Sequence, residues 1–274
     1  MNLLTEVVKF IIYSLAIVLI AKYILVGTIR KLANHLKLGP KMVGEVAGYS
    51  TSVPELLTVA ASSINGLMGA SMYNILSSNI INFIQYMASI LVNKNQKILK
   101  SKVIKIDLLL VACTILLPII FINLNLKPNL LMVVVFIGLY IFFKYIDKNA
   151  HNLYLKENHT KYKKEPKEWE KSIKYILLLI ACSILLFVVG DLLGKTLEVL
   201  CYRFKIPEII IGLLLGFITS IPELITFFES QKHHKELENE EEGVIEATNN
   251  LFISNISNLF VIQSIGILIY IIFA

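Results

Sequence analysis

Long apolar runs divide the sequence, and they limit its fold more than any other feature. A helix needs about 20 mostly apolar residues to cross the hydrocarbon core of a bilayer. Of the 274 residues, 56% are hydrophobic and only 17% are charged, whereas soluble domains are about 25% charged. We therefore expect an all-α transmembrane protein with about eight spanning helices, at residues 7–29, 41–64, 67–92, 105–123, 129–147, 172–194, 206–230 and 246–273.

The same composition excludes several other classes of protein. It does not fit a disordered chain, a collagen-like chain or a small secreted domain held together by disulfides. The three cysteines, Cys113, Cys182 and Cys201, lie in or beside apolar runs, so we expect buried free thiols. The first apolar run is not typical of a signal peptide, because it is too long, lacks a basic start and is followed by no small-residue cleavage site.

The basic residues indicate an orientation in the membrane. Loops that follow the odd-numbered spans carry 20 of the Lys and Arg residues, and the segments on the opposite side carry five. Because cytoplasmic loops collect Lys and Arg, the first set of loops is predicted to be cytoplasmic. Both termini would then lie outside the cell, and we expect an integral protein of the plasma membrane. The net charge of +6 needs no nucleic-acid partner to explain it.

An internal repeat organises the sequence. Residues 44–58, GEVAGYSTSVPELLT, recur as residues 212–226, GLLLGFITSIPELIT, with eight of fifteen positions identical. A second element, NILSSNIINF at 74–83, recurs as NLFISNISNL at 250–259. The offset grows from 168 to 176 between the two elements, which indicates an eight-residue insertion in the acidic stretch between them.

The copies are separated by five spans, an odd number, so they should cross the bilayer in opposite directions. Inverted repeats of this kind are typical of secondary transporters that bind their substrate near the midplane. We therefore predict an inverted-topology repeat bundle of five plus three helices. Its parts would be a first repeat at 1–147, a cytoplasmic linker at 148–171 and a shortened second repeat at 172–274.

The T-S-x-P-E sequence of each copy predicts a cation site. Thr51, Ser52 and Glu55 share one face of a helix, because residues three and four apart are neighbours. Pro54 cannot donate a backbone hydrogen bond and crowds the carbonyl of Ser50, which loosens the turn. Carboxylate, hydroxyl and carbonyl oxygens are the hard ligands that Ca²⁺ and Na⁺ prefer. The second copy repeats the set with Thr219, Ser220 and Glu223.

Neighbouring spans add further polar groups. Ser78 and Asn82 are four residues apart in one span, and Ser254 and Asn258 are four apart in another. Glycines one turn before each Thr, at Gly48 and Gly216, permit close helix approach. The candidate metal ligands from these motifs are therefore Glu55, Glu223, Thr51, Ser52, Thr219, Ser220, Ser78, Asn82, Ser254 and Asn258.

Charge balance connects these ligands to antiport. A carboxylate at the centre of a membrane helix costs roughly 2.5–3.5 kcal/mol on insertion scales, so it must be neutralised. Glu55 and Glu223 together neutralise one Ca²⁺, two monovalent ions or two protons. A site of this kind can exchange one divalent cation for monovalent ones.

The acidic stretch at 229–246 contains the run ENEEE at 238–242 together with His233 and His234. We interpret it as a solvated cytoplasmic loop, since runs of charge are usually solvated. A regulatory cation site at these residues is the alternative.

The quoted motifs resemble the cation/calcium exchanger superfamily, the sodium/calcium exchanger-like membrane antiporters. Its repeats carry G-T-S-x-P-E on one helix and G-S-N-x-x-N on the next. Here they read STSVPE at 50–55 with SSNIIN at 77–82, and ITSIPE at 218–223 with ISNISN at 253–258. Other residues replace the glycine that opens each family motif. The resemblance implies ten helices, of which the last two have no counterpart among the eight expected spans.

The resemblance implies alternating-access exchange of Ca²⁺ for Na⁺ or H⁺. Glu55 and Glu223 would be the Ca²⁺ carboxylates, and the Thr and Ser hydroxyls named above would be further ligands. Gly48 and Gly216 would lend carbonyls, and Asn82 and Asn258 occupy central polar positions, the second of which is Asp in some members. No cofactor is expected beyond the transported ions, and the partners would be lipid, inorganic cations and either a second copy or completing helices.

Two alternatives to this function remain at the level of sequence. A shortened, transport-inactive relative could bind cations as a sensor or subunit. A membrane enzyme would need a nucleophile with a base or a paired metal motif, and it is disfavoured because the spans contain no His.

Overall fold

The computed structural model describes residues 3–36, 38–124, 127–157 and 169–273, and their regular structure is helical throughout. The helices are α1 (Leu3–Ile20), η1 (Ala21–Val26), α2 (Gly27–His35), α3 (Pro40–Thr51), α4 (Val53–Ile64), α5 (Met68–Val92), η2 (Ile98–Lys100), α6 (Lys102–Asn123), α7 (Leu130–Glu157), α8 (Trp169–Glu198), η3 (Val199–Arg203), α9 (Glu208–Thr219), α10 (Ile221–Glu236), α11 (Glu240–Ile256), η4 (Ser257–Ile262) and α12 (Gln263–Phe273).

The prediction of an all-α transmembrane protein is confirmed. In the described ranges, seven helical segments are long and apolar enough to cross a membrane. The remaining predicted span, 41–64, is also helical, but it is divided into α3 and α4, each of 12 residues. Consecutive helices such as α1, η1 and α2 follow one another without a loop and together form one span.

Two segments that were expected to connect spans contain more helix than the sequence predicted. α7 continues to Glu157, past the expected end of the span at 147, so the first part of the predicted linker is helical. The remainder of that linker, 158–168, lies outside the described residues. The acidic stretch at 229–246 is also mostly helical, because α10 extends to Glu236 and α11 begins at Glu240. Only residues 237–239 connect these two helices.

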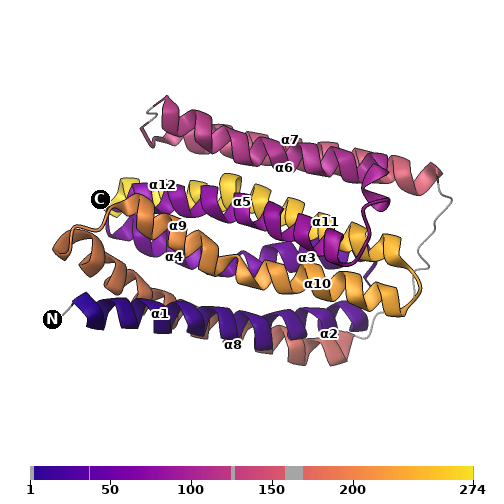
Figure 1. The fold of residues 1–274 in the computed structure, drawn as a ribbon, viewed down its shortest axis with the longest axis horizontal. Coiled ribbons are helices and arrows are strands. Elements are labelled where there is room, and N and C mark those ends of the chain that lie inside the picture. The colour runs from indigo at the N-terminus through magenta and orange to yellow at the C-terminus, as the bar shows by residue number, and fades with distance from the viewer. Residues whose placement is uncertain (1–2, 37, 125–126, 158–168, 274) are drawn as a thin grey trace.

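The helices form layers that run along the longest axis of the molecule (Figure 1). α3, α4, α5, α9, α10, α11 and α12 form the central layers, between the α6–α7 pair on one side and α1 with α8 on the other. Within the centre, α5 packs against α9, and α3 packs against α11. Each of these contacts joins the first half of the sequence to the second.

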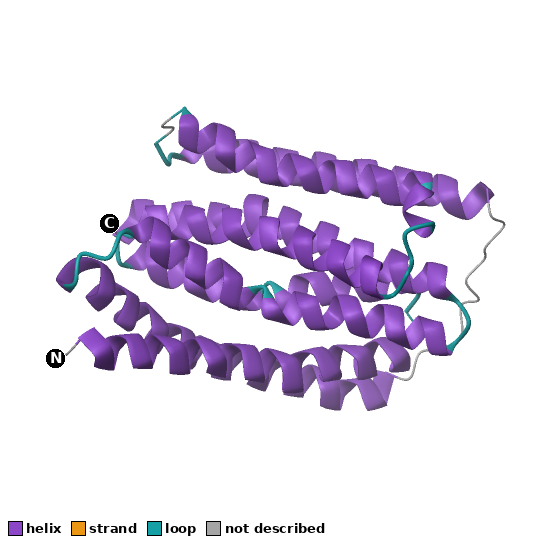
Figure 2. Ribbon diagram, viewed as in Figure 1, coloured by secondary structure: helices purple, strands orange, loops and turns teal. Residues whose placement is uncertain are grey.

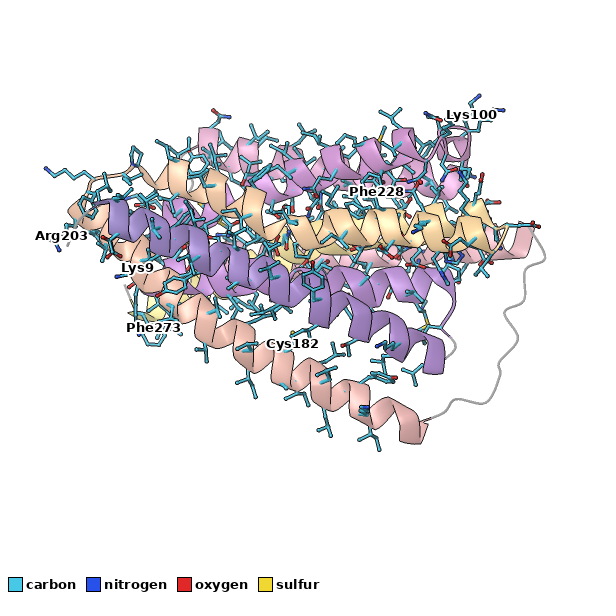
Figure 3. All side chains as sticks on the ribbon, turned by 60° about the horizontal axis from the view of Figure 1, so that its bottom comes forward. Lys9, Lys100, Cys182, Arg203, Phe228 and Phe273 are labelled. Carbon is cyan, nitrogen blue, oxygen red and sulfur yellow. The ribbon has the colours of Figure 1, made fainter. Side chains whose placement is uncertain are left out.

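The two copies of the repeat run in opposite directions. The path through α3 and α4 leads toward the end of the bundle that holds both termini, and the path through α9 and α10 leads away from it (Figure 1). The α5–α6 and α10–α11 connections lie at the other end, where α2 ends and α3 begins. Figure 3 shows the same separation, with Lys100 at one end of the molecule and Arg203 and Phe273 at the other. The chain thus has the predicted antiparallel relation between the two motifs.

The outer helices expose large apolar side chains, as a protein surrounded by lipid tails requires. These exposed residues include Leu4, Ile12, Leu116, Leu131, Val134, Ile141, Ile184 and Val188. The polar side chains are concentrated inside the bundle instead. Buried hydroxyls and amides line α4, α5, α10 and α11, the helices that carry the two repeated motifs.

Candidate functional site

Each T-S-x-P-E motif breaks its helix at the serine. α3 ends at Thr51 and α4 begins at Val53, so Ser52 lies between them. In the second copy Ser220 lies in the same way between α9 and α10. The proline two residues later explains both breaks, because its nitrogen carries no proton and its ring crowds the preceding turn. Figure 2 shows a loop interruption near the middle of the bundle, where the neighbouring helices continue.

The break places each glutamate in the first turn of a new helix. Glu55 is the third residue of α4, and Glu223 is the third residue of α10. The amino-terminal end of a helix carries a partial positive charge, which favours a carboxylate there. Both residues have an exposed fraction of 0%.

Glycines allow the broken helices to approach α5 and α11 closely. A Cβ added at Gly48 would lie 2.8 Å from both the Asn250 carbonyl oxygen and the Ile253 Cβ. A Cβ added at Gly216 would lie 2.6 Å from the Asn74 carbonyl oxygen. Real Cβ atoms do not approach so closely, so any larger residue would separate these helices. The predicted role of both glycines in close packing is therefore observed.

Hydroxyl groups hold the two carboxylates. Ser78 donates from its Oγ to Glu55 Oε1 at 2.8 Å, and Ser254 donates from its Oγ to Glu223 Oε1 at 3.1 Å. The predicted ligands of the opposite repeat also lie near these groups, Thr219 near Glu55 and Thr51 near Glu223, while their hydroxyls donate to the carbonyls of Leu215 and Ala47. Each carboxylate is thus surrounded by groups from both copies of the motif.

Serine pairs join the two repeats directly. The hydroxyl oxygens of Ser78 and Ser220 are 3.0 Å apart, and those of Ser254 and Ser52 are also 3.0 Å apart. Ser52 and Ser220 lie at the helix breaks, so each break is hydrogen-bonded to the long helix of the other repeat. Their hydroxyls also reach the carbonyls of Gly48 and Gly216, at 2.8 and 2.7 Å respectively.

Four asparagines complete the centre of the site. Asn82 donates from its Nδ2 to Ser254 Oγ at 3.2 Å, and Asn258 donates from its Nδ2 to Ser78 Oγ at 3.4 Å. The same two amides also donate to the side-chain oxygens of Asn255 and Asn79, at 3.3 and 3.2 Å respectively. Asn79 and Asn255 in turn donate to each other's backbone carbonyls, at 3.2 and 3.1 Å. Each of these asparagine bonds therefore has a counterpart in the other repeat.

Four buried oxygens of the site, which have no hydrogen-bond partner in the described residues, follow the same symmetry. Glu55 Oε2 and Glu223 Oε2 form one such pair, and Asn82 Oδ1 and Asn258 Oδ1 form another. A buried polar atom without a partner costs free energy, and here the unpartnered atoms are all acceptors. Carboxylate and amide oxygens of this kind are ligands for a hard cation. The arrangement can therefore surround a small cation with oxygen atoms from both repeats.

All twelve predicted ligands thus lie in or beside this site, but the prediction omitted several residues that contribute to it. Asn79 and Asn255 belong to the centre, and Thr58 with Asn74 and Thr226 with Asn250 form the next pairs outward. Asn74 Nδ2 donates to Thr58 Oγ1 at 2.7 Å, and Asn250 donates to Thr226 in the same way. The signal that could have found them is their identity between the two copies of the repeat.

A small apolar pocket lies away from this site. It is lined by residues of α5, α6, α7, η4 and α12, with Met72, Phe136 and Ile267 among them. Neither glutamate borders it. A cavity of this kind fits apolar groups better than ions, so the buried polar centre remains the candidate functional site.

The comparison with known proteins agrees with this geometry. The sodium/calcium exchanger protein family matches residues 7–147 and 174–273, which is most of the chain. The chain belongs to this family. No match was found among proteins with curated descriptions.

Solved structures of the sodium-calcium exchanger NCX_Mj have a similar fold. One, soaked with 2.5 mM Na⁺ and 10 mM Sr²⁺, is 20% identical with a TM-score of 0.56. Another, soaked with 100 mM Na⁺ and 10 mM Sr²⁺, is 22% identical with a TM-score of 0.57. Each alignment covers 98% of this chain and 83% of the other. Family membership and the apolar helices together make this chain an integral membrane protein for cation exchange.

Proposed function

We propose that this exchanger-family protein moves Ca²⁺ across the membrane in exchange for Na⁺ or H⁺. The observation that carries the proposal is the pair of fully buried glutamates, Glu55 and Glu223, at the start of two oppositely directed helices. Each has one carboxylate oxygen held by a serine and one without a partner in the described residues. A divalent cation between them would neutralise both charges, and two monovalent cations would do the same.

The symmetry of the site supports alternating access. The bonds around Glu55 and those around Glu223 are equivalent, although the two repeats run in opposite directions. Exchanging the conformations of the two repeats would keep the central ligands and move the opening to the other face of the membrane. The serine contacts between repeats, such as Ser52 with Ser254, are the ones that this exchange would break and remake.

The test is flux of ⁴⁵Ca²⁺ into vesicles that contain the purified protein, with the Na⁺ gradient and the pH gradient imposed separately. Uptake driven by only one of the gradients identifies the counter-ion. Glu55→Gln and Glu223→Gln should each abolish uptake, because a neutral amide cannot balance the charge of the ion. Glu240→Gln is a suitable control, since Glu240 is exposed at the start of α11. Full uptake in both buried variants would refute the proposal.

The same experiment separates exchange from the transport-inactive alternative. Saturable Ca²⁺ binding that depends on both glutamates, without flux under either gradient, would favour a cation-binding sensor or subunit. We further propose that the protein lies in the plasma membrane with both termini outside the cell. Labelling single cysteines introduced in the α5–α6 and α6–α7 connections of intact cells tests this orientation, because only the second should react with an impermeant reagent.

A further inference from the structure

The two helical hairpins that carry the repeats differ in length. At the offset of 168, the end of α4 at Ile64 corresponds to Lys232, but α10 continues to Glu236. At the offset of 176, the start of α5 at Met68 corresponds to Val244, but α11 begins earlier, at Glu240. The eight-residue insertion therefore adds about one turn to each helix of the second hairpin.

A cluster of titratable side chains, two of them buried, lies where the added turns join the rest of the hairpin. His234 Nε2 lies 3.0 Å from Glu246 Oε2, and His234 Nδ1 lies 3.7 Å from Glu242 Oε2. The side chains of His234 and Glu246 are only 9% and 6% exposed, whereas that of Glu242 is 30% exposed. Gly243 makes this contact between the helices possible, because a Cβ there would lie 2.9 Å from the His234 Cβ.

The cluster lies on a line of oxygen-bearing residues along α11 and η4. Residues four apart stack on one face of a helix, and in this line they lead from the helix start to the central site. The line consists of Glu242, Glu246, Asn250, Ser254 and Asn258. The exposed fraction falls along it, from a partly exposed Glu242 to Ser254 and Asn258 at 0%.

The corresponding line in the first repeat lacks the acidic part. Asn74, Ser78 and Asn82 on α5 match Asn250, Ser254 and Asn258, but Ala70 stands where the second repeat has Glu246, and Gly66 stands where it has Glu242. The acidic extension therefore exists on one half of the molecule only. It lies at the end that holds the α10–α11 connection (Figure 1).

Unpartnered polar atoms lie on this line and beside it. Asn249 Oδ1 and Asn250 Oδ1 are buried without a hydrogen-bond partner in the described residues, and so is His234 Nδ1. All three residues are more than nine-tenths buried. Asn249 and Asn250 follow Glu246 by three and four residues, so they lie between it and the central site. The two amide oxygens are further hard ligands between the glutamates and Ser254.

We infer that Glu246, together with Glu242, binds the transported cation as it passes between the α10–α11 end of the bundle and the central site. His234 pairs with Glu246 when no cation is bound, and the cation replaces it. The inference rests on the proposed exchange function. Because the first repeat has no equivalent acids, this step exists on one face of the membrane only.

The test compares the two faces of the membrane. In vesicles of each orientation, the Ca²⁺ concentration is varied on the outside while the opposing gradient is held constant. Glu246→Gln should raise the KM for Ca²⁺ presented at the α10–α11 face by about tenfold, the loss expected for one charged ligand. The KM for Ca²⁺ presented at the opposite face should stay within about twofold of the original value.

Glu240→Gln is the matched control, because it removes the same charge from an exposed position on the same helix. Glu242→Gln, at a partly exposed position, should raise the same KM less strongly, and it serves if Glu246→Gln does not fold. Equal KM changes at both faces, or no change in either variant, would overturn the inference while leaving the exchange function intact. Absence of flux in the original protein would instead refute the exchange function itself.

Discussion

The hydroxyl oxygens of Ser52 and Ser254 lie 3.0 Å apart although 202 residues separate them in the sequence. Ser52 lies at the break between α3 and α4, and Ser254 lies on α11 and donates to Glu223. The pair thus connects the broken helix of one repeat to the carboxylate of the other. Any motion that separates the repeats must break this bond, so the central ligands and the helix arrangement are coupled.

Replacing both members of this pair should show that coupling. Ser52→Ala and Ser254→Ala should each reduce Ca²⁺ affinity, and the double variant should lose less than the sum of the two. The expected interaction free energy is about 0.5–1.5 kcal/mol, the net value of one hydrogen bond. A double-mutant cycle by isothermal titration measures it. Ser264→Ala is the control, because Ser264 donates to the Phe260 carbonyl one turn earlier in the chain and not to the other repeat. Strict additivity of Ser52→Ala and Ser254→Ala would contradict the prediction.

Alanine at either close-packed glycine should destabilise the fold. Gly48→Ala places a methyl group 2.8 Å from atoms of α11, and Gly216→Ala places one 2.6 Å from α5. Overpacking of this kind costs about 1–3 kcal/mol, and we expect lower thermal unfolding temperatures in detergent. Gly138→Ala is the matched control, since a Cβ at Gly138 meets nothing within 4 Å. If all three variants unfolded at one temperature, the close approach of the repeats would be in doubt.

An acidic residue at 258 should make the fold depend on divalent cations. Asn258 donates from its Nδ2 to Ser78 Oγ and to Asn79 Oδ1. Asp at this position would have no N–H to donate, and its carboxylate oxygen would face Asn79 Oδ1. We expect Asn258→Asp to lower stability without Ca²⁺ by about 1–3 kcal/mol, the cost of an unsatisfied buried group. Saturating Ca²⁺ should then raise its unfolding temperature by more than it raises that of the original protein. A smaller rise would show that residue 258 lies outside cation contact.

The buried ion pair of Lys41 and Asp147 offers a test that is independent of transport. Lys41 Nζ donates to both carboxylate oxygens of Asp147 at 2.7 and 2.8 Å, and the Asp147 side chain is 1% exposed. Lys41→Met leaves a buried charge without this partner and should cost about 3–5 kcal/mol, more than removing both charges in Lys41→Met with Asp147→Leu.

Lys144→Met provides the comparison for this pair. Lys144 and Glu45 also form an ion pair, but each side chain is 26% exposed. Solvent reaches such a pair, so its loss should cost no more than about 1 kcal/mol. Chemical unfolding in detergent measures all these variants. Equal losses for Lys41→Met and Lys144→Met would contradict the assigned difference in burial.

Local patterns in the sequence were sufficient to find the spans and most of the site. Apolar runs of about 20 residues locate membrane helices because the bilayer thickness imposes that length. Pro54 was expected to loosen its turn for an equally local reason, the missing backbone donor, but the structure goes further and breaks the helix at Ser52. The repeat indicated most of the site residues, but Asn79 and Asn255 were missing from the predicted ligands although they are identical in the two copies.

The acidic stretch shows where local patterns fail. Charge runs are usually solvated, and this predicted a loop at 229–246. The structure instead extends α10 and α11 through it and buries His234 against Glu246. The pairing depends on Gly243, which allows the two helices to approach closely enough for the side chains to meet.

The amino-acid sequence by itself determined the membrane environment, the antiparallel relation of the two motifs and the identity of the two buried acids. The membrane environment follows from the length of the apolar runs. The antiparallel relation follows from the odd number of spans between the two copies, and the two acids are identified by their position inside apolar runs. Only the tertiary structure decided which groups of one repeat face those of the other, such as Ser52 with Ser254 or Lys41 with Asp147. Such contacts depend on how whole helices pack, and glycines such as Gly48 act by setting how closely they approach.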